Sequence, residues 1–258
     1  MKLRKALRLI LLLVCLCVFI LSGYKIISLK MTEKKASDLY DSTFQKAVTV
    51  NTVSDAGNFG TGTDAPLTEQ LKAPISINFN LLQEQCDDIV GWLYSPGTPI
   101  NYPVVKGKDN AEYLNKMFNG ESNRAGSLFV DYRLDDIDNC RNYIIYGHNM
   151  KNNTMFGTLD LYKKQEYYEQ HKVIYYLTPE SEYAINVYAG FVTAADSDSY
   201  KMNRTEQELE SYMANMKEWS TFNSGINYLA GDNIVTLSTC AYNYKDARYV
   251  LVGIIKKI

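Results

Sequence analysis

The sequence predicts a β-dominated fold of the barrel type behind a helical N-terminal extension. Short segments with strand-like alternation recur from residue 89 to the end of the chain, separated by turn residues, and only two stretches among them have helical spacing. The 258 residues include 21 tyrosines, which favour strands with half-buried faces. We therefore expect an all-β or β-dominated barrel rather than a parallel α/β sheet.

The first thirty residues have the pattern of a membrane anchor. Basic residues precede an apolar run from Leu9 to Leu21, and apolar residues continue to Leu29. A secretory signal peptide has the same charge order and remains the alternative, but no cleavage site of small residues follows the run. We expect residues 1–30 to be a basic cytoplasmic tip and a single span of the cell membrane, with the rest of the chain outside the cell.

The charge distribution argues against nucleic-acid binding. Residues 31–258 keep 21 of the 27 basic residues and all 29 acidic ones, which gives that part a net charge of −8. A basic surface is therefore not expected, and no nucleic acid is expected as a partner.

Three of the five cysteines lie beyond the anchor. Cys15 and Cys17 fall in the apolar run, which leaves Cys86, Cys140 and Cys240 outside. An odd number leaves at least one free thiol in a monomer. Cys86 and Cys140 could pair, although two buried or unreactive thiols are favoured. No spacing of Cys or His is typical of a zinc site, so no metal is expected.

Between anchor and barrel the sequence predicts a stalk. Met31 to Val50 has the spacing of a moderately amphipathic helix, and Asn51 to Pro66 is rich in Gly, Thr, Asn and Asp, which predicts a linker. We assign residues 31–76 to a helical stalk and flexible linker, and residues 77–258 to the folded domain. Within that domain, Ile77 to Asp88 has near-helical spacing.

The domain is predicted to hold eight strands and two longer helices. Strands are expected at Ile89 to Tyr94, Ile100 to Val105, Ser127 to Tyr132, Asn142 to Tyr146, Val173 to Leu177, Tyr183 to Ala194, Asn233 to Cys240 and Arg248 to Ile255. Pro103 interrupts the second and suggests an edge strand or a bulge. Helices are expected from about Met155 to Gln170 and from about Thr205 to Trp219, the latter with a capping-box signature in Thr205 and Glu208.

Cys240 ends the run Thr236-Leu-Ser-Thr-Cys240. Alternation puts Thr236, Ser238 and Cys240 on one strand face. A thiol in the core would have apolar neighbours on that face, so the two hydroxyl side chains favour an exposed, reactive Cys240. If the last two strands form a hairpin centred near Tyr244, Cys240 and Arg248 face each other with Cβ atoms about 5 Å apart. A slip of one residue would send Arg248 to the opposite face.

His148 is one of only two histidines and lies in Tyr146-Gly-His-Asn-Met150, where a strand ends. Taken alone, a histidine in such a place is more often a surface or core residue than a catalyst. His171, between a helix and a strand, keeps that assignment. A thiol, an imidazole and a guanidinium are nevertheless the groups that acyl transfer through a thioester needs.

In combination these motifs resemble the sortases, membrane-anchored cysteine transpeptidases on the surface of Gram-positive bacteria. Thr236 to Cys240 matches the family's TLxTC motif, Arg248 stands where its arginine follows, and Tyr146-Gly-His148-Asn matches its histidine segment, so that the resemblance covers roughly Ile89 to Ile258. The long N-terminal helical region, Gly91 to Val104, Ala125 to Arg133 and the helix from Thr205 to Trp219 look like class B.

The resemblance implies an eight-stranded β-barrel with a helix inserted before the cysteine strand. It implies that Cys240 is the nucleophile, His148 the acid/base and Arg248 the oxyanion stabiliser. Weaker candidates for substrate contact are Ser238, Tyr113, Leu114 and Asn115. No cofactor is expected, and the protein is expected to be a monomer.

The reaction that the resemblance implies is cleavage of a C-terminal sorting-signal peptide after threonine. A thioacyl-enzyme on Cys240 would then pass the surface protein to an amine of the cell-wall precursor, in the peptidoglycan cross-bridge. Three alternatives stay open: a pilin-polymerising sortase, a membrane-tethered cysteine protease, and a non-catalytic binding module.

Overall fold

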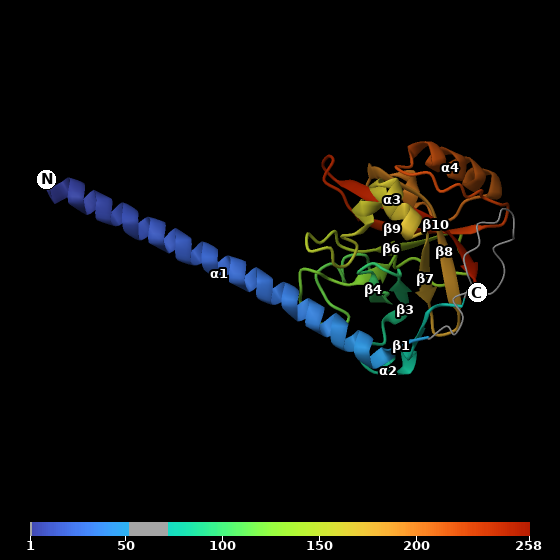
Figure 1. Cartoon of the computed structure of the whole chain (residues 1–258), viewed down its shortest axis with the longest axis horizontal. Coiled ribbons are helices and arrows are strands. Elements are labelled where there is room, and N and C mark those ends of the chain that lie inside the picture. The colour runs from blue at the N-terminus through green and yellow to red at the C-terminus, as the bar shows by residue number, and fades with distance from the viewer. Residues whose placement is uncertain (1, 52–71) are drawn as a thin grey trace.

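A long N-terminal helix leads into a closed β-barrel in the computed structural model (Figure 1), which describes residues 2–51 and 72–258. The predicted linker from Asn51 to Pro66 lies outside these residues, except for Asn51. The helices are α1 (Lys2–Ala47), α2 (Phe79–Gln83), α3 (Gln165–Gln170) and α4 (Glu206–Trp219), with 3-10 turns at Leu159–Lys163 and Asp198–Tyr200. The strands are β1 (Val48–Val50), β2 (Ile75–Ile77), β3 (Ile89–Tyr94), β4 (Asn101–Val105), β5 (Leu128–Val130), β6 (Asn142–Tyr146), β7 (Val173–Leu177), β8 (Glu182–Ala194), β9 (Asn233–Cys240) and β10 (Ala247–Lys257).

Eight strands close the barrel in the order β10-β8-β7-β3-β4-β5-β6-β9, which confirms the predicted fold class. Closure leaves the barrel without an edge strand, so its backbone hydrogen-bonding groups are paired between neighbours. Most neighbours are antiparallel, but β4–β5 and β6–β9 are parallel. The β6–β9 pair joins two strands that lie about ninety residues apart in the sequence.

Each of the last two strands has an inner and an outer face. Tyr249 and Leu251 of β10 belong to the core inside the barrel, whereas Val250 and Val252 belong to a second apolar cluster outside it. The side chains of α4 that cover this outer cluster are Leu209, Tyr212, Met213 and Met216. By alternation, Arg248 lies on the same outer face as Val250, and its partner Cys240 lies on that face too. The face of the sheet that packs against α4 therefore also carries these two residues.

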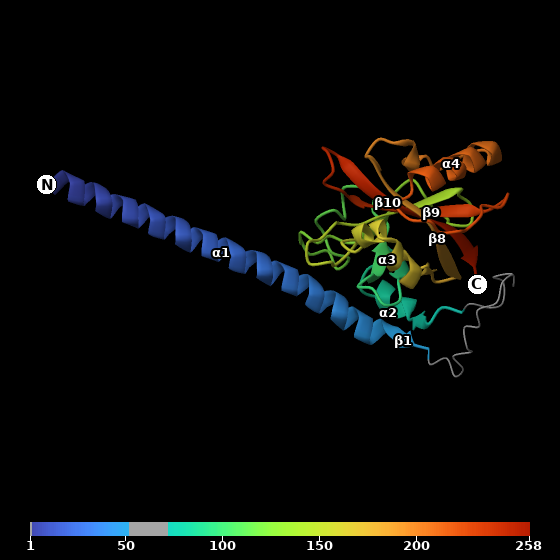
Figure 2. The same ribbon diagram turned by 45° about the horizontal axis from the view of Figure 1, so that its top comes forward.

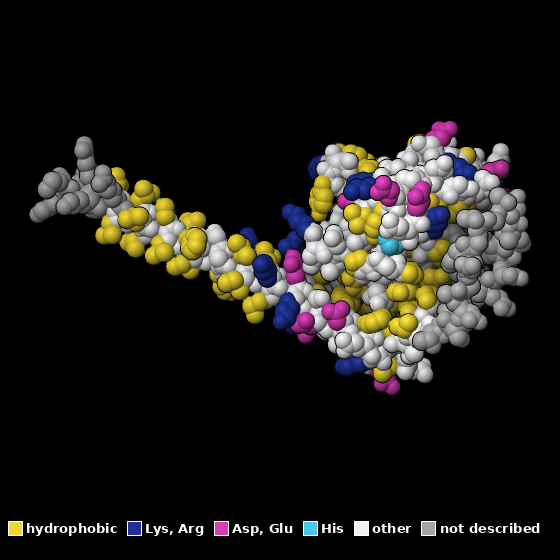
Figure 3. All heavy atoms as spheres, viewed as in Figure 1, with side chains coloured by type: hydrophobic (Ala, Val, Ile, Leu, Met, Phe, Trp, Pro, Cys, Tyr) yellow, Lys and Arg dark blue, Asp and Glu magenta, His cyan; other side chains and the backbone are white. Residues whose placement is uncertain are grey.

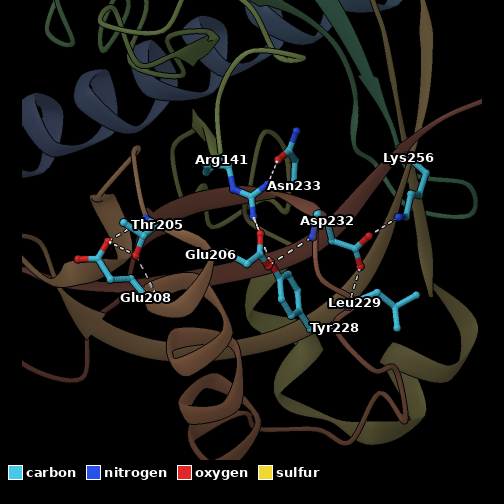
Figure 4. Close-up of polar contacts among 10 residues, drawn as sticks. Arg141, Thr205, Glu206, Glu208, Tyr228, Leu229, Asp232, Asn233 and Lys256 are labelled. Atoms are coloured by element: carbon cyan, nitrogen blue, oxygen red, sulfur yellow. Dashed lines mark hydrogen bonds and ion pairs between the residues drawn. The ribbon is translucent and has the colours of Figure 1, made fainter.

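The inserted helix α4 begins as predicted. Thr205 accepts a hydrogen bond from the backbone N–H of Glu208 and the Glu208 carboxylate accepts one from the backbone of Thr205, which completes the capping box. Nearby, Arg141 binds the Glu206 carboxylate at 2.6 Å and Asn233 at 3.1 Å (Figure 4). These contacts tie the start of α4 to the residue before β6 and to the first residue of β9.

The single helix predicted from about Met155 to Gln170 is wrong, because the segment is broken into two shorter helical pieces. A 3-10 turn, Leu159–Lys163, is followed by α3, and Lys164 between them is extended (φ −106°, ψ 128°). Tyr162 and Tyr168 are both buried. One straight helix would point residues six apart about 120° away from each other, and the break allows both rings to reach the core.

Pro103 does not mark an edge strand. β4 pairs with β3 along its length, with Trp92 opposite Pro103, and with β5 only at Val104 and Val105. The ladder to β5 therefore starts after Pro103, and the missing N–H breaks no bond in it. The irregularity lies in β3 instead, between Ile89 and Gly91.

The N-terminal helix is longer than either of the two segments predicted for it. α1 runs without a break from Lys2 to Ala47, and Val48–Val50, predicted as its last turn, forms β1 paired with β2. Leu9–Ala47 is long and apolar enough to cross a membrane by length and composition. Figure 3 shows hydrophobic side chains along the part of α1 that projects from the body.

The C-terminal part of α1 packs on the barrel. Ala36, Tyr40 and Ala47 are buried, and the Tyr40 ring meets Tyr102 edge to face at 5.1 Å. The Tyr40 hydroxyl donates to the carbonyl of Gly126 at 2.7 Å. The predicted boundaries between anchor, stalk and folded domain, after residues 30 and 76, stay predictions. The last turns of α1, which fall in the predicted stalk, nevertheless share a hydrophobic core with the barrel. Ile77 to Asp88, expected to be helical, is helical only in α2.

Candidate active site

The hairpin of β9 and β10 has the predicted register. Cys240 lies directly opposite Arg248 in the antiparallel ladder, and the next pair closes the turn, with Ala241 N–H donating to Ala247 O at 2.9 Å. Both residues are partly exposed at the turn end of the hairpin. Figure 2 shows this hairpin extending from the body on the side from which α1 leaves.

His148 reaches the same place from the other side of β9. The parallel ladder pairs Tyr146 with Ser238, and the chain then continues through Gly147, whose N–H donates to Ser238 O at 3.1 Å. Thr239 Oγ1 donates to Gly147 O at 2.8 Å. β9 is thus the central strand, with Arg248 on one neighbour and His148 following the other.

The loop after His148 is fixed to the cysteine backbone. Asn149 Nδ2 donates to the carbonyl of Cys240 at 2.8 Å. His148 Nε2 lies 2.6 Å from Leu114 O, and since a carbonyl only accepts, Nε2 is the protonated nitrogen of this pair. The imidazole is therefore oriented by a backbone group, and Nδ1 is the nitrogen left for exchange with a reactant.

A groove of about 260 Å³ brings these residues together. Its lining includes Cys240, His148 and Arg248, and with them the weaker candidates Ser238 and Leu114. The other lining residues are not among the predicted site residues; they are Asn110, Phe129, Tyr146, Gly147, Ala195, Tyr200 and Thr239. Aromatic rings make up a large part of this set, which suits the binding of an extended peptide.

The hydroxyl-rich face of β9 is more enclosed than predicted. Thr236 Oγ1 donates to Asn142 at 2.7 Å, and Ser238 Oγ lies 2.8 Å from the hydroxyl of Tyr200. Thr236 and Ser238 are buried, whereas Cys240 is partly exposed. Asn142 binds the Thr236 hydroxyl and Tyr200 binds that of Ser238, so Cys240 is the most exposed of the three side chains.

Tyr200 and Tyr146 form one wall of the groove. Their rings stack at a centroid distance of 6.0 Å and an angle of 19°. Burial raises the pKa of Tyr200, so that its phenol stays protonated at neutral pH and can donate a hydrogen bond. Tyr146 shares the strand face of His148 by alternation and could have been found that way. Tyr200 lies in a segment whose sequence carries no such signal.

The three weaker candidates from one loop separate in the structure. Leu114 lines the groove and supplies the carbonyl that binds His148. Tyr113 is buried, and its hydroxyl donates to Asp88 at 2.5 Å, outside the groove lining. Asn115 is exposed and also lies outside the lining. The structure therefore brings only Leu114 to Cys240.

The remaining thiols of the described domain have other surroundings. Cys86 and Cys140 are both free, and Cys86 Sγ lies 3.9 Å from the Tyr113 hydroxyl. Burial raises the pKa of Cys140 to about 12, with the nearby Asp136 adding to the shift. Among the described residues, no group of three His, Cys, Asp or Glu side chains could hold a metal ion.

Comparisons with known proteins place the chain in a family. The family model of the sortase domain matches residues 93–255. Sortase B of Staphylococcus aureus is 32% identical over 93% of each chain, and sortase B of Listeria monocytogenes is 32% identical over 98% of each chain.

Solved structures give the same result. A Staphylococcus aureus sortase B–substrate complex superposes with a TM-score of 0.66 and 37% identity, covering 70% of this chain and 85% of that one. Sortases are cysteine transpeptidases, and the chain belongs to the sortase family, with class B sortases as its relatives.

Proposed function

We propose that this sortase cleaves a C-terminal sorting-signal peptide after its threonine and transfers the surface protein to an amine of the cell-wall precursor. The observation that carries the proposal is the position of Cys240 at the end of β9, opposite Arg248 and next to the loop of His148. The thiol, imidazole and guanidinium line one groove. Acyl transfer through a thioester requires this set of groups.

In the first step the sulfur of Cys240 attacks the threonine carbonyl carbon while its thiol proton passes to His148. A C–S bond forms, the peptide C–N bond breaks, and the leaving amine takes that proton from His148. The Leu114 carbonyl, bound to Nε2, holds the ring so that Nδ1 performs this transfer. Arg248, which keeps its charge at any working pH, donates hydrogen bonds to the oxygen of the tetrahedral intermediate.

In the second step the acceptor amine attacks the thioester. A new C–N bond forms, the C–S bond breaks, and His148 takes the proton that the amine loses and passes it to the departing sulfur, which restores the thiol. The products are the surface protein joined to the cross-bridge amine and the free enzyme. Atoms and charge balance without any further reactant.

The groove supports a peptide as the substrate. Its aromatic wall offers apolar contact, and the hydroxyl of Tyr200 and the amide of Asn110 offer hydrogen bonds to a peptide backbone. The Staphylococcus aureus relative has been solved as a substrate complex. This relationship supports binding of a peptide substrate by this chain as well.

The N-terminal helix supports a location at the cell membrane. We assign residues 1–30 to the cytoplasmic tip and anchor, residues 31–76 to the stalk and linker, and residues 77–258 to the extracellular catalytic domain. Basic residues come before the apolar run, which favours a cytoplasmic N-terminus.

The test uses the full chain in detergent with sorting-signal peptides from surface proteins of the same organism. Mass spectrometry should find Cys240 carrying the peptide fragment that ends in threonine, and an added cross-bridge amine should release it as a new amide. A hydrolysed peptide with no amide product indicates a protease. Transfer to a pilin lysine in preference to the cross-bridge amine indicates pilin polymerisation. Absence of any adduct rejects the proposal.

A further inference from the structure

A fully buried carboxylate lies behind the groove and takes no part in the chemistry described above. Asp131 directly follows β5, and its side chain has no exposed surface. Arg133 binds it in a fork, Nε to one oxygen at 2.7 Å and Nη2 to the other at 2.8 Å. Such a paired arrangement fixes the orientation of the carboxylate.

The same carboxylate holds two side chains of the groove lining. Its Oδ2 atom accepts from Asn110 Nδ2 at 3.0 Å and from the Tyr146 hydroxyl at 2.9 Å. The other end of the Asn110 amide accepts from the backbone N–H of Tyr132 at 3.0 Å, so the amide has one orientation only. Asp131 thereby links two lining residues that come from separate segments of the chain.

Tyr146 transmits this constraint to the rest of the wall. Its ring stacks on Tyr200 and lies 5.3 Å from the ring of Phe129. Tyr200 in turn contacts Ser238, two residues before the nucleophile. The Tyr146 ring is therefore packed between Phe129 and Tyr200 in the wall of the groove that also holds Cys240.

We propose that Asp131 is a positioning residue for substrate binding, which holds Asn110 and Tyr146 in the arrangement that an extended peptide requires. The inference rests on the proposed function, because it assigns the groove to a peptide. Asp131 does not line the groove and is therefore expected to act on peptide affinity and not on the bond-making steps.

The low pKa of the group agrees with this role. Burial by itself would raise the pKa of Asp131, but the hydrogen bonds from Arg133 and Asn110 outweigh it and lower the value to about 2. The carboxylate is thus charged at every pH at which the enzyme could work, and all its partners are donors. An amide in its place would direct N–H groups at some of those donors.

The test is Asp131→Asn in the full chain, with a sorting-signal peptide as substrate. The KM for the peptide should rise about tenfold or more, the size expected for losing charge-assisted hydrogen bonds, with kcat within about threefold. Alkylation of Cys240 by iodoacetamide should keep its wild-type rate, since that small reagent does not need the wall.

Asp232→Asn is the matched control. Asp232 is also a buried aspartate, bound by Lys256 and by the backbone N–H of Leu229 at 3.0 Å (Figure 4). It directly precedes β9, whereas Cys240 is the last residue of that strand. It should lower stability and leave KM unchanged. A KM for Asp131→Asn equal to that of the control overturns the inference, and so does a loss confined to kcat and to Cys240 alkylation.

Tyr146→Phe covers the case in which Asp131→Asn does not fold. It removes one hydrogen bond to Asp131 and keeps the ring, and KM should rise several-fold at constant kcat, as for a single bond. A wild-type KM in this variant overturns the inference. Failure of the wild-type enzyme to form any thioacyl adduct would instead refute the proposed function. The two outcomes are distinguishable, because one is measured on the variant and the other on the wild-type enzyme.

Discussion

Tyr146 lies opposite Ser238 in the parallel β6–β9 ladder, so the chain arrives at His148 where β9 arrives at Cys240. Both residues are two positions beyond that pair. Because the antiparallel partner β10 has Arg248 opposite Cys240, three strands deliver the three side chains to one end of the sheet. The reactive groups are therefore fixed by strand register, which tolerates little local movement.

Cys240→Ala should abolish both peptide cleavage and covalent capture, whereas Cys86→Ala and Cys140→Ala should retain them. Only Cys240 lines the groove, and the raised pKa of Cys140 keeps that thiol protonated at neutral pH. Intact-mass measurement of each variant after exposure to peptide provides the check. An adduct on Cys86 or Cys140 would move the active site elsewhere.

Arg248→Lys should resemble Arg248→Ala and lower kcat/KM about 10²-fold or more, because lysine keeps the charge but lacks the planar pair of donors. Steady-state kinetics on both variants test this, with circular dichroism as the control for folding. If lysine restores most of the activity that alanine loses, charge alone matters and the directed hydrogen bonds do not.

Gly147→Ala should displace His148. An added Cβ would lie 2.4 Å from Leu128 Cδ2 and 2.7 Å from Phe156 Cδ2, well inside contact distance. Relief of that overlap should cost about 1–3 kcal/mol of stability, and misplacement of the imidazole by about 1 Å could cost about 10²-fold in kcat. Urea unfolding and kinetics measure the two effects.

Gly231→Ala is the control for that variant. Gly231 has φ +91°, which strains any other residue, but a Cβ there meets no atom within 4 Å. It should cost about 1–3 kcal/mol through the backbone and leave kcat unchanged. Equal kcat values for the two glycine variants would show that the packing at Gly147 does not position His148.

Thr205→Ala should lower the unfolding free energy by about 1 kcal/mol through loss of the capping box of α4. For a domain of this size the Tm should fall by about 2–4 °C. Differential scanning calorimetry measures the shift, and Thr205→Ser, which keeps the hydroxyl, should restore it. Activity at 25 °C should stay near the wild-type level, because α4 lies outside the groove lining.

Asp131 should give the protein an acid-sensitive part of its stability. With a folded pKa of about 2 and an unfolded value of about 3.9, the group stabilises the fold above pH 4 by about 2 kcal/mol, and this contribution disappears as the pH falls from 4 to 2. Urea unfolding of wild type and Asp131→Asn should differ at pH 7 and converge near pH 2. A constant difference across this range would contradict the assignment.

The sequence was sufficient for much of the fold and for the prediction that Cys240, His148 and Arg248 come together, which the groove lining confirms. Alternation and turn residues located all eight barrel strands to within a few residues, and the Thr205–Glu208 signature identified the start of α4. The hairpin register followed from the short segment between Cys240 and Arg248, because a local turn determines local pairing. The break at Lys164 could not be predicted, since it depends on which rings the core accepts.

What the sequence by itself determined was local: the strands, the cap, the hairpin that sets Cys240 against Arg248, and the family motifs. The tertiary structure alone decided that β6 lies parallel to β9, which makes His148 a neighbour of Cys240. It also decided that Tyr200 and Asn110 line the groove with Asp131 behind them, while Tyr113 and Asn115 point elsewhere. Pairing between distant strands follows from how the whole barrel closes, and no single segment carries that information.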